Sequence, residues 1–314
     1  MNYHRNYIRL GILLIICITL QSCGYTQPIG TGLLSYVSEN LVLETANGHF
    51  ETFPFLQGEI TSYNWSPDGK SIAFEDRRNF PGSDISIINI DGTGDKNLTT
   101  SRDRNEFDPS WSPDGRKIIF TSSVGGGHGD IWIINSDGTN PKQLTMNNGN
   151  NYNPSWSPDG KYIIFTSSLD GEPSIYRMKT DGSEIHLLAN NGSEPSWNPD
   201  GKKIAFVRCL DKEIESNIPG KVMIVDNPEI FVMNSDGTDQ LQLTNNPDYD
   251  IHPKWSLDGN KIAFVSRREE NESCPIYDLK SGGTLGIYIM NPDGTELKLI
   301  TDICEYGNFP NWKR

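Results

Sequence analysis

Polar and ionisable residues recur at one fixed position of this 314-residue chain, three residues before a tryptophan. The tryptophans are Trp65, Trp111, Trp156, Trp197, Trp255 and Trp312. The residues three before them are, in turn, Ser62, Asp108, Asn153, Glu194, His252 and Phe309. Two carboxylates and an imidazole could bind a ligand or a metal ion together, but only if the fold brings equivalent positions to one place.

A second repeated position lies two residues after the phenylalanine of each repeat, or after Tyr36. It holds Ser38, Asp76, Ser122, Ser167, Arg208 and Ser266. We expect Asp76, Asp108, Glu194, Arg208 and His252 to converge with Asn153 and Phe309 on a ligand-binding funnel. The alternative is a polar funnel that holds only water.

The elements that carry these residues are short strands. Most repeats contain Pro-x-Trp, then an Ile-x-Phe segment such as Ile118–Phe120, then a β-branched segment such as Ile131–Ile134, and then Leu-Thr or a near variant of it. Pro-Asp-Gly separates the first two segments and Asp-Gly-Thr the last two, and both favour tight turns because glycine accepts a positive φ. Each repeat therefore predicts a four-stranded antiparallel meander.

The repeat spacing predicts a β-propeller. Successive tryptophans lie 41 to 58 residues apart, close to the length of one blade. Trp312 has no second strand after it, whereas Leu33–Val37, Leu41–Thr45 and His49–Phe53 predict three strands with no first strand. Joined together, these ends would complete a ring, so we expect an all-β, six-bladed propeller over residues 33–314.

Long insertions are expected on one face of that ring. All Asp-Gly turns would lie on the opposite face, while Arg208–Asn227, Arg267–Gly286 and Gly125–Gly129 would form loops on this one. Because loops on a rigid scaffold commonly carry function, we place the ligand site on the face with the insertions. Aromatic residues near its mouth suit a protein or a glycan partner: Tyr152, Tyr249, Tyr306 and Phe309.

The repeat motifs Trp-Ser-Pro-Asp-Gly-Lys/Arg, Ile-x-Phe-x-Ser and Asn-x-Asp-Gly-Thr resemble the WD-like repeats of TolB-type β-propellers. The resemblance spans Leu33 to Trp312 and implies the propeller fold. TolB itself has a further N-terminal domain, whereas only a short segment precedes the repeats here. The resemblance therefore does not carry the role of the Tol system directly to this chain.

The N-terminal segment is typical of a bacterial lipoprotein signal. Arg5 and Arg9 precede an apolar stretch, Leu10–Leu20, and Leu20-Gln21-Ser22-Cys23 resembles a lipobox. The resemblance implies that residues 1–22 are removed, that Cys23 is lipidated and that residues 23–32 form a tether. The alternatives are an ordinary secretory signal and an uncleaved anchor.

Composition and cysteine usage agree with a location outside the cytoplasm. The formal net charge of −14 disfavours nucleic acid and anionic membrane surfaces, so we expect the membrane to be contacted only through the lipid. Cys209, Cys274 and Cys304 fall in or beside loops of the same face, where a disulfide could persist. Cys274 with Cys304 is the preferred pair, and Cys209 with Cys274 is the alternative.

Catalytic signatures are weak. The chain has no Gly-x-Ser-x-Gly motif and no Asp-x-Asp-x-Asp-Gly calcium loop, and we expect neither a cofactor nor a metal ion. The sequence predicts a lipid-anchored, extracytoplasmic module that binds a protein or a glycan of the cell envelope. The rival hypothesis is a metal-dependent polysaccharide lyase, which the resemblance allows because some TolB-like propellers are lyases.

Overall fold

The fold was analysed in a computed structural model. It describes residues 33–37, 41–44, 50–53, 62–78, 82–100, 103–125, 127–146, 149–215, 222–268, 284–303 and 310–313. The predicted signal segment and tether, with Cys23, lie outside the described residues. So do Ser38, Cys274, Cys304, Tyr306 and Phe309.

Five four-stranded antiparallel sheets follow one another along the chain. Blade 1 comprises β4 (Tyr63–Trp65), β5 (Ser71–Asp76), β6 (Asp84–Asn89) and β7 (Lys96–Asn97). Blade 2 comprises β8 (Arg104–Trp111), β9 (Lys117–Val124), β10 (Gly129–Asn135) and β11 (Lys142–Gln143). Blade 3 comprises β12 (Asn151–Trp156), β13 (Tyr162–Ser167), β14 (Ser174–Lys179) and β15 (His186–Ala189). Blade 4 comprises β16 (Gly192–Trp197), β17 (Lys203–Glu215), β18 (Val222–Asn234) and β19 (Leu241–Gln242). Blade 5 comprises β20 (Asp250–Trp255), β21 (Ile262–Arg268), β22 (Thr284–Met290) and β23 (Lys298–Ile303).

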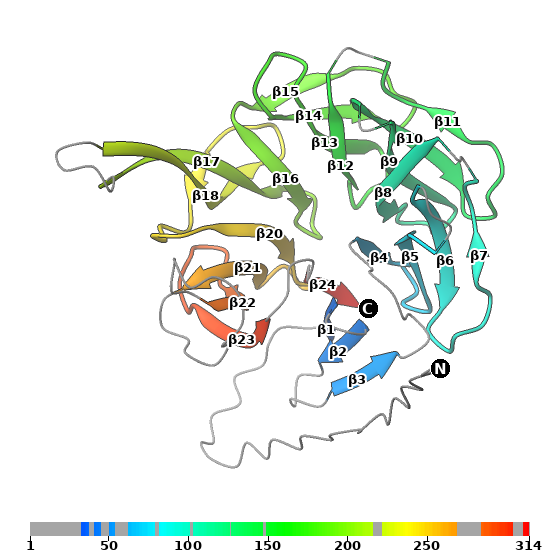
Figure 1. The fold of residues 1–314 in the computed structure, drawn as a ribbon, viewed down its shortest axis with the longest axis horizontal. Coiled ribbons are helices and arrows are strands. Elements are labelled where there is room, and N and C mark those ends of the chain that lie inside the picture. Colours follow the sequence, from blue (N-terminus) through cyan, green and yellow to red (C-terminus); the bar gives the residue numbers. More distant parts are fainter. Residues whose placement is uncertain are drawn as a thin grey trace, which may run out of the picture.

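A further four-stranded sheet combines the two ends of the chain. Its order is β24-β1-β2-β3, with β24 (Asn311–Lys313), β1 (Leu33–Val37), β2 (Leu41–Glu44) and β3 (Phe50–Phe53). Strands β24 and β1 are antiparallel, and Leu33 pairs with Lys313. Figure 1 shows the sheets arranged around a central axis, with the first strand of each blade innermost. The predicted all-β propeller is confirmed.

The Asp-Gly turns form as the sequence predicts, for a local reason. In blade 1 the hydroxyl of Ser66 donates to Asp68 Oδ1 at 2.7 Å, and the same oxygen accepts from the backbone N–H of Lys70 at 3.1 Å. Gly69 takes a φ of 67°, which a residue with a Cβ seldom adopts. The same Ser–Asp hydrogen bond recurs at Ser112, Ser157 and Ser256, so the turn is a repeated unit.

The core lies between neighbouring sheets rather than within one of them. The phenylalanines of the Ile-x-Phe strands Phe120, Phe165, Phe206 and Phe264 are at most 1% exposed. Trp156 of blade 3 packs in one cluster with Ile119 and Ile131 of blade 2. Each sheet therefore completes the core of its neighbour, and a single blade would leave much of its apolar surface in water.

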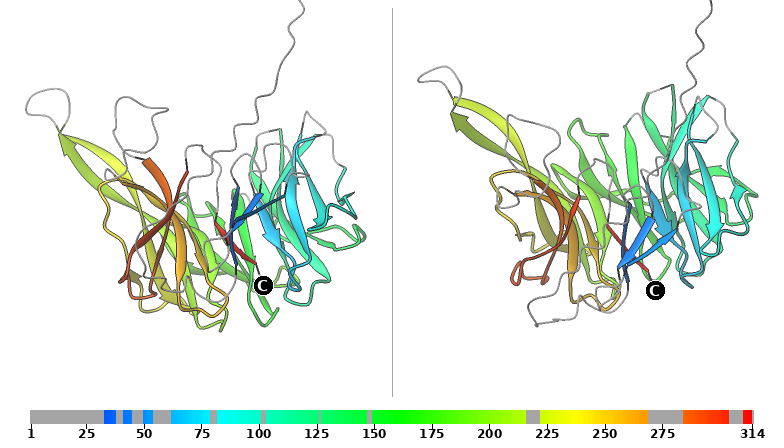
Figure 2. Two further views of the ribbon diagram at one scale, coloured as in Figure 1. Left: turned by 90° about the horizontal axis from the view of Figure 1, so that it is seen from below. Right: turned by 60° about the horizontal axis from the view of Figure 1, so that its bottom comes forward.

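The strands of blades 4 and 5 extend further on one face of the ring than on the other. Strands β17 and β18 pair from Lys203 with Asn234 to Glu215 with Val222, and the hairpin projects beyond the ring on the face opposite the Asp-Gly turns (Figure 2). Sequence analysis gave Arg208–Asn227 as a loop, and this prediction is wrong because the two strands continue in register through it. Strands β21 and β22 likewise extend to the pair Arg268 and Thr284.

Among the described residues, no helix is long and apolar enough to cross a membrane.

The seam between the chain ends gives a testable prediction. Trp312 is 4% exposed, packs with Ala263 and Ile289 of blade 5, and donates its indole N–H to the backbone oxygen of Lys254 at 3.1 Å. We expect Trp312→Ala to lower the free energy of unfolding by about 3 to 5 kcal/mol, because it opens a cavity at the seam. Denaturant unfolding measures this, and a loss below about 1 kcal/mol would show that the seam contributes little.

Candidate functional site

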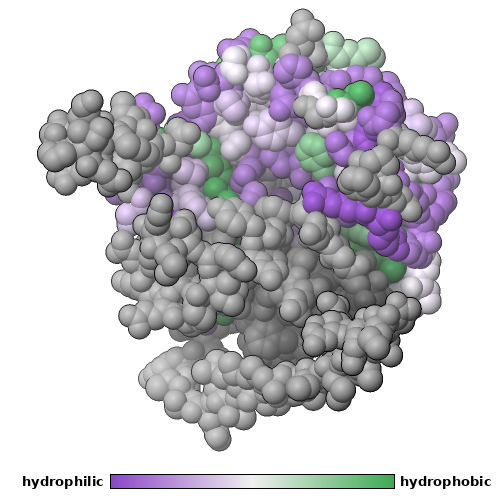
Figure 3. Space-filling view, viewed as in Figure 1, coloured by the Kyte–Doolittle hydropathy of each residue, from purple (hydrophilic) through white to green (hydrophobic). Residues whose placement is uncertain are grey.

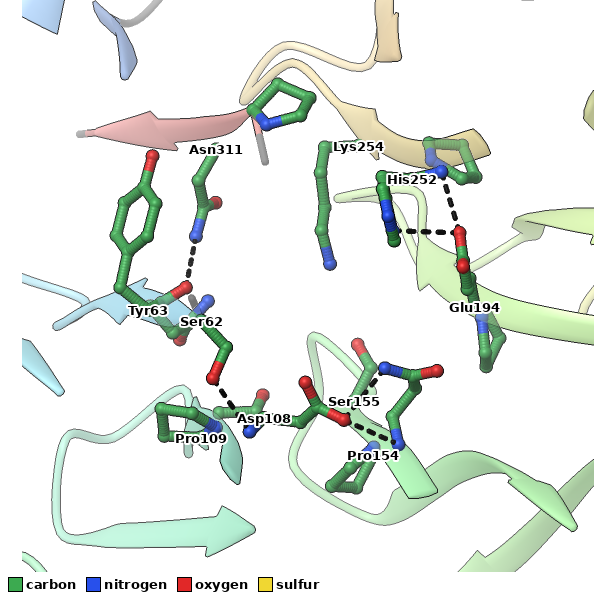
Figure 4. Close-up of a pocket in the computed structure, with 16 residues that line it drawn as sticks. Ser62, Tyr63, Asp108, Pro109, Pro154, Ser155, Glu194, His252, Lys254 and Asn311 are labelled. Carbon is green, nitrogen blue, oxygen red and sulfur yellow. Dashed lines mark hydrogen bonds and ion pairs between the residues drawn. The ribbon is translucent and has the colours of Figure 1, made fainter. Parts of the chain in front are cut away.

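An axial pocket opens where the first strands of the blades begin, on the face that carries the long β17–β18 hairpin. Its volume is about 110 Å³. Its polar lining residues are Ser62, Tyr63, Asn64, Asp108, Ser110, Asn153, Ser155, Glu194, His252, Lys254 and Asn311. Figure 4 shows their side chains around one open space. Five of the six residues that lie three positions before a tryptophan therefore come together, as predicted. The sixth, Phe309, lies outside the described residues.

A β-bulge aims these side chains at the axis. Asp108, Asn153, Glu194 and His252 have φ values of 53°, 49°, 54° and 57°. Each lies where the pairing of the first two strands of its blade shifts register. Residues other than glycine seldom adopt a positive φ, and bulges redirect side chains. Four consecutive blades thus keep one strained conformation, which is a common feature of functional sites.

Hydrogen bonds between blades account for part of the polar pattern. The backbone N–H of Asp108 donates to Ser62 Oγ at 3.0 Å. The backbone and side-chain N–H groups of Asn153 donate to Asp108 Oδ2, at 3.3 and 2.9 Å. Ser62, Asp108 and Glu194 thus each accept a hydrogen bond from the bulge of the next blade. The bulge at Glu194 instead donates its backbone N–H to Thr166 Oγ1 of blade 3. The residues that line the pocket therefore also have a structural role.

The pocket changes the ionisation of Asp108. Burial and the charge of nearby Glu75 together raise its pKa to about 6, against the hydrogen bond from Asn153 and the positive charge of Lys254. Around pH 6, the protonated and the ionised form of the Asp108 carboxyl group are therefore both populated. It can accept or donate a hydrogen bond within a narrow pH range.

Glu194 and His252 form a pair across the pocket from Asp108. The backbone N–H and the Nδ1 atom of His252 lie 2.7 and 2.9 Å from Glu194 Oε2 (Figure 4). Burial raises the pKa of Glu194, but the charge and hydrogen bonds of His252 outweigh it and leave the pKa below its ordinary value. Glu194 therefore stays ionised and fixes the orientation of the imidazole.

Lys254 is a pocket residue that sequence analysis missed. It occupies the position directly before tryptophan, where the other repeats have Asn64, Ser110, Ser155, Ser196 and Asn311. The sequence signal for this residue is its long, positively charged side chain at a position where the other repeats have short polar side chains. Burial lowers the pKa of Lys254, while the charges of Asp108 and Glu194 act in the opposite direction.

A second chamber continues the axial pocket toward the Asp-Gly turns, with a volume of about 240 Å³. It is lined by all six repeat tryptophans and by proline residues of the Trp-Ser-Pro motifs. Asn64, Ser110, Ser155, Lys254 and Asn311 line both chambers and mark the waist between them.

Asp76 does not line the axial pocket, contrary to the expected convergence. Its side chain is 1% exposed and lies 2.6 Å from Arg78 Nη2, and it accepts a hydrogen bond from Ser86 Oγ at 2.7 Å. Burial raises the pKa of Asp76, but these hydrogen bonds outweigh it and hold the pKa below its ordinary value. Arg78 also bridges to Asp95, so Asp76 stabilises blade 1.

Arg208 is also absent from the pocket lining. Its guanidinium lies over the rings of Phe206 and Phe231, 5.3 and 4.9 Å from their centroids. It donates to the backbone oxygen of Asn190 and to Gln240 Oε1. The predicted position two residues after phenylalanine therefore belongs to the packing of each blade and not to the axis.

The cysteines and the possible metal ligands are only partly covered by the described residues. Cys209 is exposed on β17, whereas Cys274 and Cys304 lie outside the described residues, so both predicted pairings stay untested. Within the described part of the chain, no group of three or more His, Cys, Asp and Glu side chains is placed to hold a metal ion.

Radial sheets around a polar axial pocket define a β-propeller. Residues 56–222 match the profile of the PD40 family, described as the TolB beta propeller domain. This match covers more than half of the chain, which belongs to that family. No curated protein sequence matches the chain.

Solved structures with the same fold include two TolB proteins. TolB from Acinetobacter baumannii is 24% identical with a TM-score of 0.69, over 90% of this chain and 66% of that one. A protein assigned as TolB from Agrobacterium tumefaciens is 22% identical with a TM-score of 0.61, over 86% and 88%. An oligogalacturonate lyase in complex with manganese is 13% identical with a TM-score of 0.53, over 89% and 75%. The chain thus spans slightly less than two thirds of the A. baumannii protein, and these likenesses establish the fold.

The raised pKa of Asp108 predicts a pH-dependent stability. A carboxyl group whose pKa is about 6 in the folded chain and 3.8 ordinarily favours folding when protonated, and this contribution is lost as the pH rises through 6. Asp108→Asn keeps the shape and removes the charge. We expect it to be more stable than the unmodified protein by roughly 1 kcal/mol at pH 8, with the difference shrinking toward zero at pH 4.

Thermal or denaturant unfolding at both pH values measures this difference. Asp114→Asn is the matched control, because Asp114 lies in an exposed Asp-Gly turn where hydrogen bonds from Ser112 and Arg116 lower its pKa. An Asp108→Asn protein that is less stable at pH 8 would contradict the assignment.

Proposed function

We propose that this chain is a lipid-anchored, non-catalytic binding module of the bacterial cell envelope, and that its axial pocket receives a segment of a partner protein. The observation that carries the proposal is the repeated bulge. Four blades hold different polar residues in the same strained conformation and direct them to one space. Their shared framework and varied side chains suit recognition of one specific ligand.

The charge and shape of the pocket support binding more than chemistry. Asp108, Glu194, His252 and Lys254 supply donors and acceptors of both signs at hydrogen-bonding range of a small group. Figure 3 shows the face seen in Figure 1, where hydrophilic residues prevail over much of the described surface. A polar recess within such a surface favours a hydrogen-bonded peptide segment over a large apolar one.

The location outside the cytoplasm is part of the proposal. Membership of the TolB beta propeller domain family supports an envelope protein. The segment Leu20-Gln21-Ser22-Cys23 supports a lipid on Cys23, with residues 23–32 as the tether to the propeller. The acidic composition supports contact with the membrane through this lipid alone.

We also infer that the composite sheet of β24 and β1–β3 acts as a sixth blade and closes the ring. Its strand order matches that of the five contiguous blades, and Trp312 occupies the same place as their tryptophans. Closure would keep the axial pocket in shape, and the unfolding of the Trp312→Ala protein tests it.

The rival lyase function has no specific observation in its favour. Similarity to the manganese-bound oligogalacturonate lyase lies at 13% identity and concerns the fold. We therefore develop the binding function alone.

Affinity capture tests the proposal. Full-length protein extracted from native membranes should retain a specific partner protein, and Asp108→Ala and His252→Ala should each reduce its recovery at least tenfold with unchanged melting. Such a loss corresponds to about 1.4 kcal/mol or more of binding free energy, a moderate effect for a truncated polar contact.

His128→Ala is the matched control, because His128 is exposed in the β9–β10 connection of the same face. Equal recovery with all four proteins would place the binding site elsewhere. Recovery of the protein only from the soluble fraction would contradict the lipid anchor.

A further inference from the structure

The amino group of Lys254 enters the axial pocket without a protein partner. The side chain leaves β20 directly before Trp255 and extends into the open space, as Figure 4 shows. The charges of Asp108 and Glu194 act on Lys254 from a distance, but among the described residues no ion pair within 4.0 Å and no hydrogen bond joins Lys254 Nζ to another group. Three donors of a charged amine thus face a recess of about 110 Å³.

The carboxylates of Asp108 and Glu194 line the same pocket, and each has one oxygen that accepts no hydrogen bond among the described residues. Asp108 uses Oδ2 to accept from Asn153, and Glu194 uses Oε2 to accept from His252. Within the described chain, neither Asp108 Oδ1 nor Glu194 Oε1 takes part in a hydrogen bond. The pocket therefore offers a set of unused donors beside two unused acceptors.

This arrangement disfavours a charged ligand of either sign. A carboxylate that reached Lys254 would approach Asp108 and Glu194, and an ammonium group that reached those acids would approach Lys254. The side chains of His252 and Glu194 are only 23% and 21% exposed, and between groups removed from bulk water such like-charge contacts cost more than in water. A neutral group that both donates and accepts avoids the repulsion and can satisfy both sides.

We propose that the axial pocket binds the primary carboxamide of a glutamine or asparagine side chain. The carbonyl oxygen accepts from Lys254 Nζ, and the NH₂ group donates to Asp108 Oδ1 or Glu194 Oε1. Tyr63, Asn64 and Asn311 bound the same space and limit it to one end group. The inference rests on the proposed function in taking the ligand as part of a protein.

The test uses the full-length protein and three small probes of similar size: the N-methylamides of N-acetylglutamine, N-acetylglutamate and N-acetyllysine. Only the glutamine side chain among them carries a primary carboxamide. Ligand-observed NMR titration at pH 7.5 gives their dissociation constants. We expect the glutamine probe to bind at least fivefold more tightly than either charged probe. Lys254→Met should abolish this preference, and Lys202→Met, in an exposed Asp-Gly turn of the opposite face, should leave it intact.

Several results would overturn the carboxamide site. They are a glutamate or lysine probe that binds as tightly as glutamine, glutamine binding that survives Lys254→Met, tighter binding of N-acetylglucosamine than of the glutamine probe, or no binding by any probe. The charge series on the unmodified protein decides the question even where the variant fails to fold. Loss of the site with partner capture intact would leave the proposed function standing, whereas probe binding without partner capture would contradict the proposed function and not the site.

Discussion

Burial of large side chains between neighbouring sheets is the constraint on which the rest of this structure depends. Phenylalanines of the second strands, such as Phe120 and Phe165, are excluded from water only when the next sheet covers them. This requirement stacks the sheets side by side, and their curvature brings every first strand to the axis. The polar residues of these strands then share one space although they lie far apart in the sequence.

The strained backbone at the bulges directs polar side chains into that shared space. A regular first strand would point successive side chains to its two faces, between the blades. The positive φ at Asp108, Glu194 and His252 turns the chain so that these side chains reach the axis instead. The hydrogen bond that the backbone N–H of each bulge donates to the neighbouring blade helps to hold the conformation. The same contacts therefore stabilise the ring and position the pocket.

Much of the fold could be predicted from the sequence because its signals are local and repeated. Pro-Asp-Gly predicts the turns, and Ile-x-Phe predicts the buried strand. The third position before each tryptophan predicts four of the pocket residues, Asp108, Asn153, Glu194 and His252. The rest depends on orientation within a sheet, which spacing does not give. Asp76 and Arg208 lie on second strands and are held by Arg78 and by aromatic rings inside or beside their own blades. Sequence spacing predicts a loop over Arg208–Asn227 because this segment exceeds the length of the other repeats, whereas the structure pairs Cys209–Glu215 with Val222–Pro228 as continued strands.

The central claim is that recognition occurs at the axial pocket on the face with the long hairpin. Site-specific photo-crosslinking tests it most directly, with benzoylphenylalanine in place of Tyr63, which lines the pocket, or of Tyr162, which lies near the Asp-Gly turns. Both replace a tyrosine by the same larger aromatic side chain, and both proteins are irradiated in native membranes. The account predicts crosslinks to one partner protein from position 63 and none to it from position 162. Crosslinks to that partner from position 162 alone would contradict it.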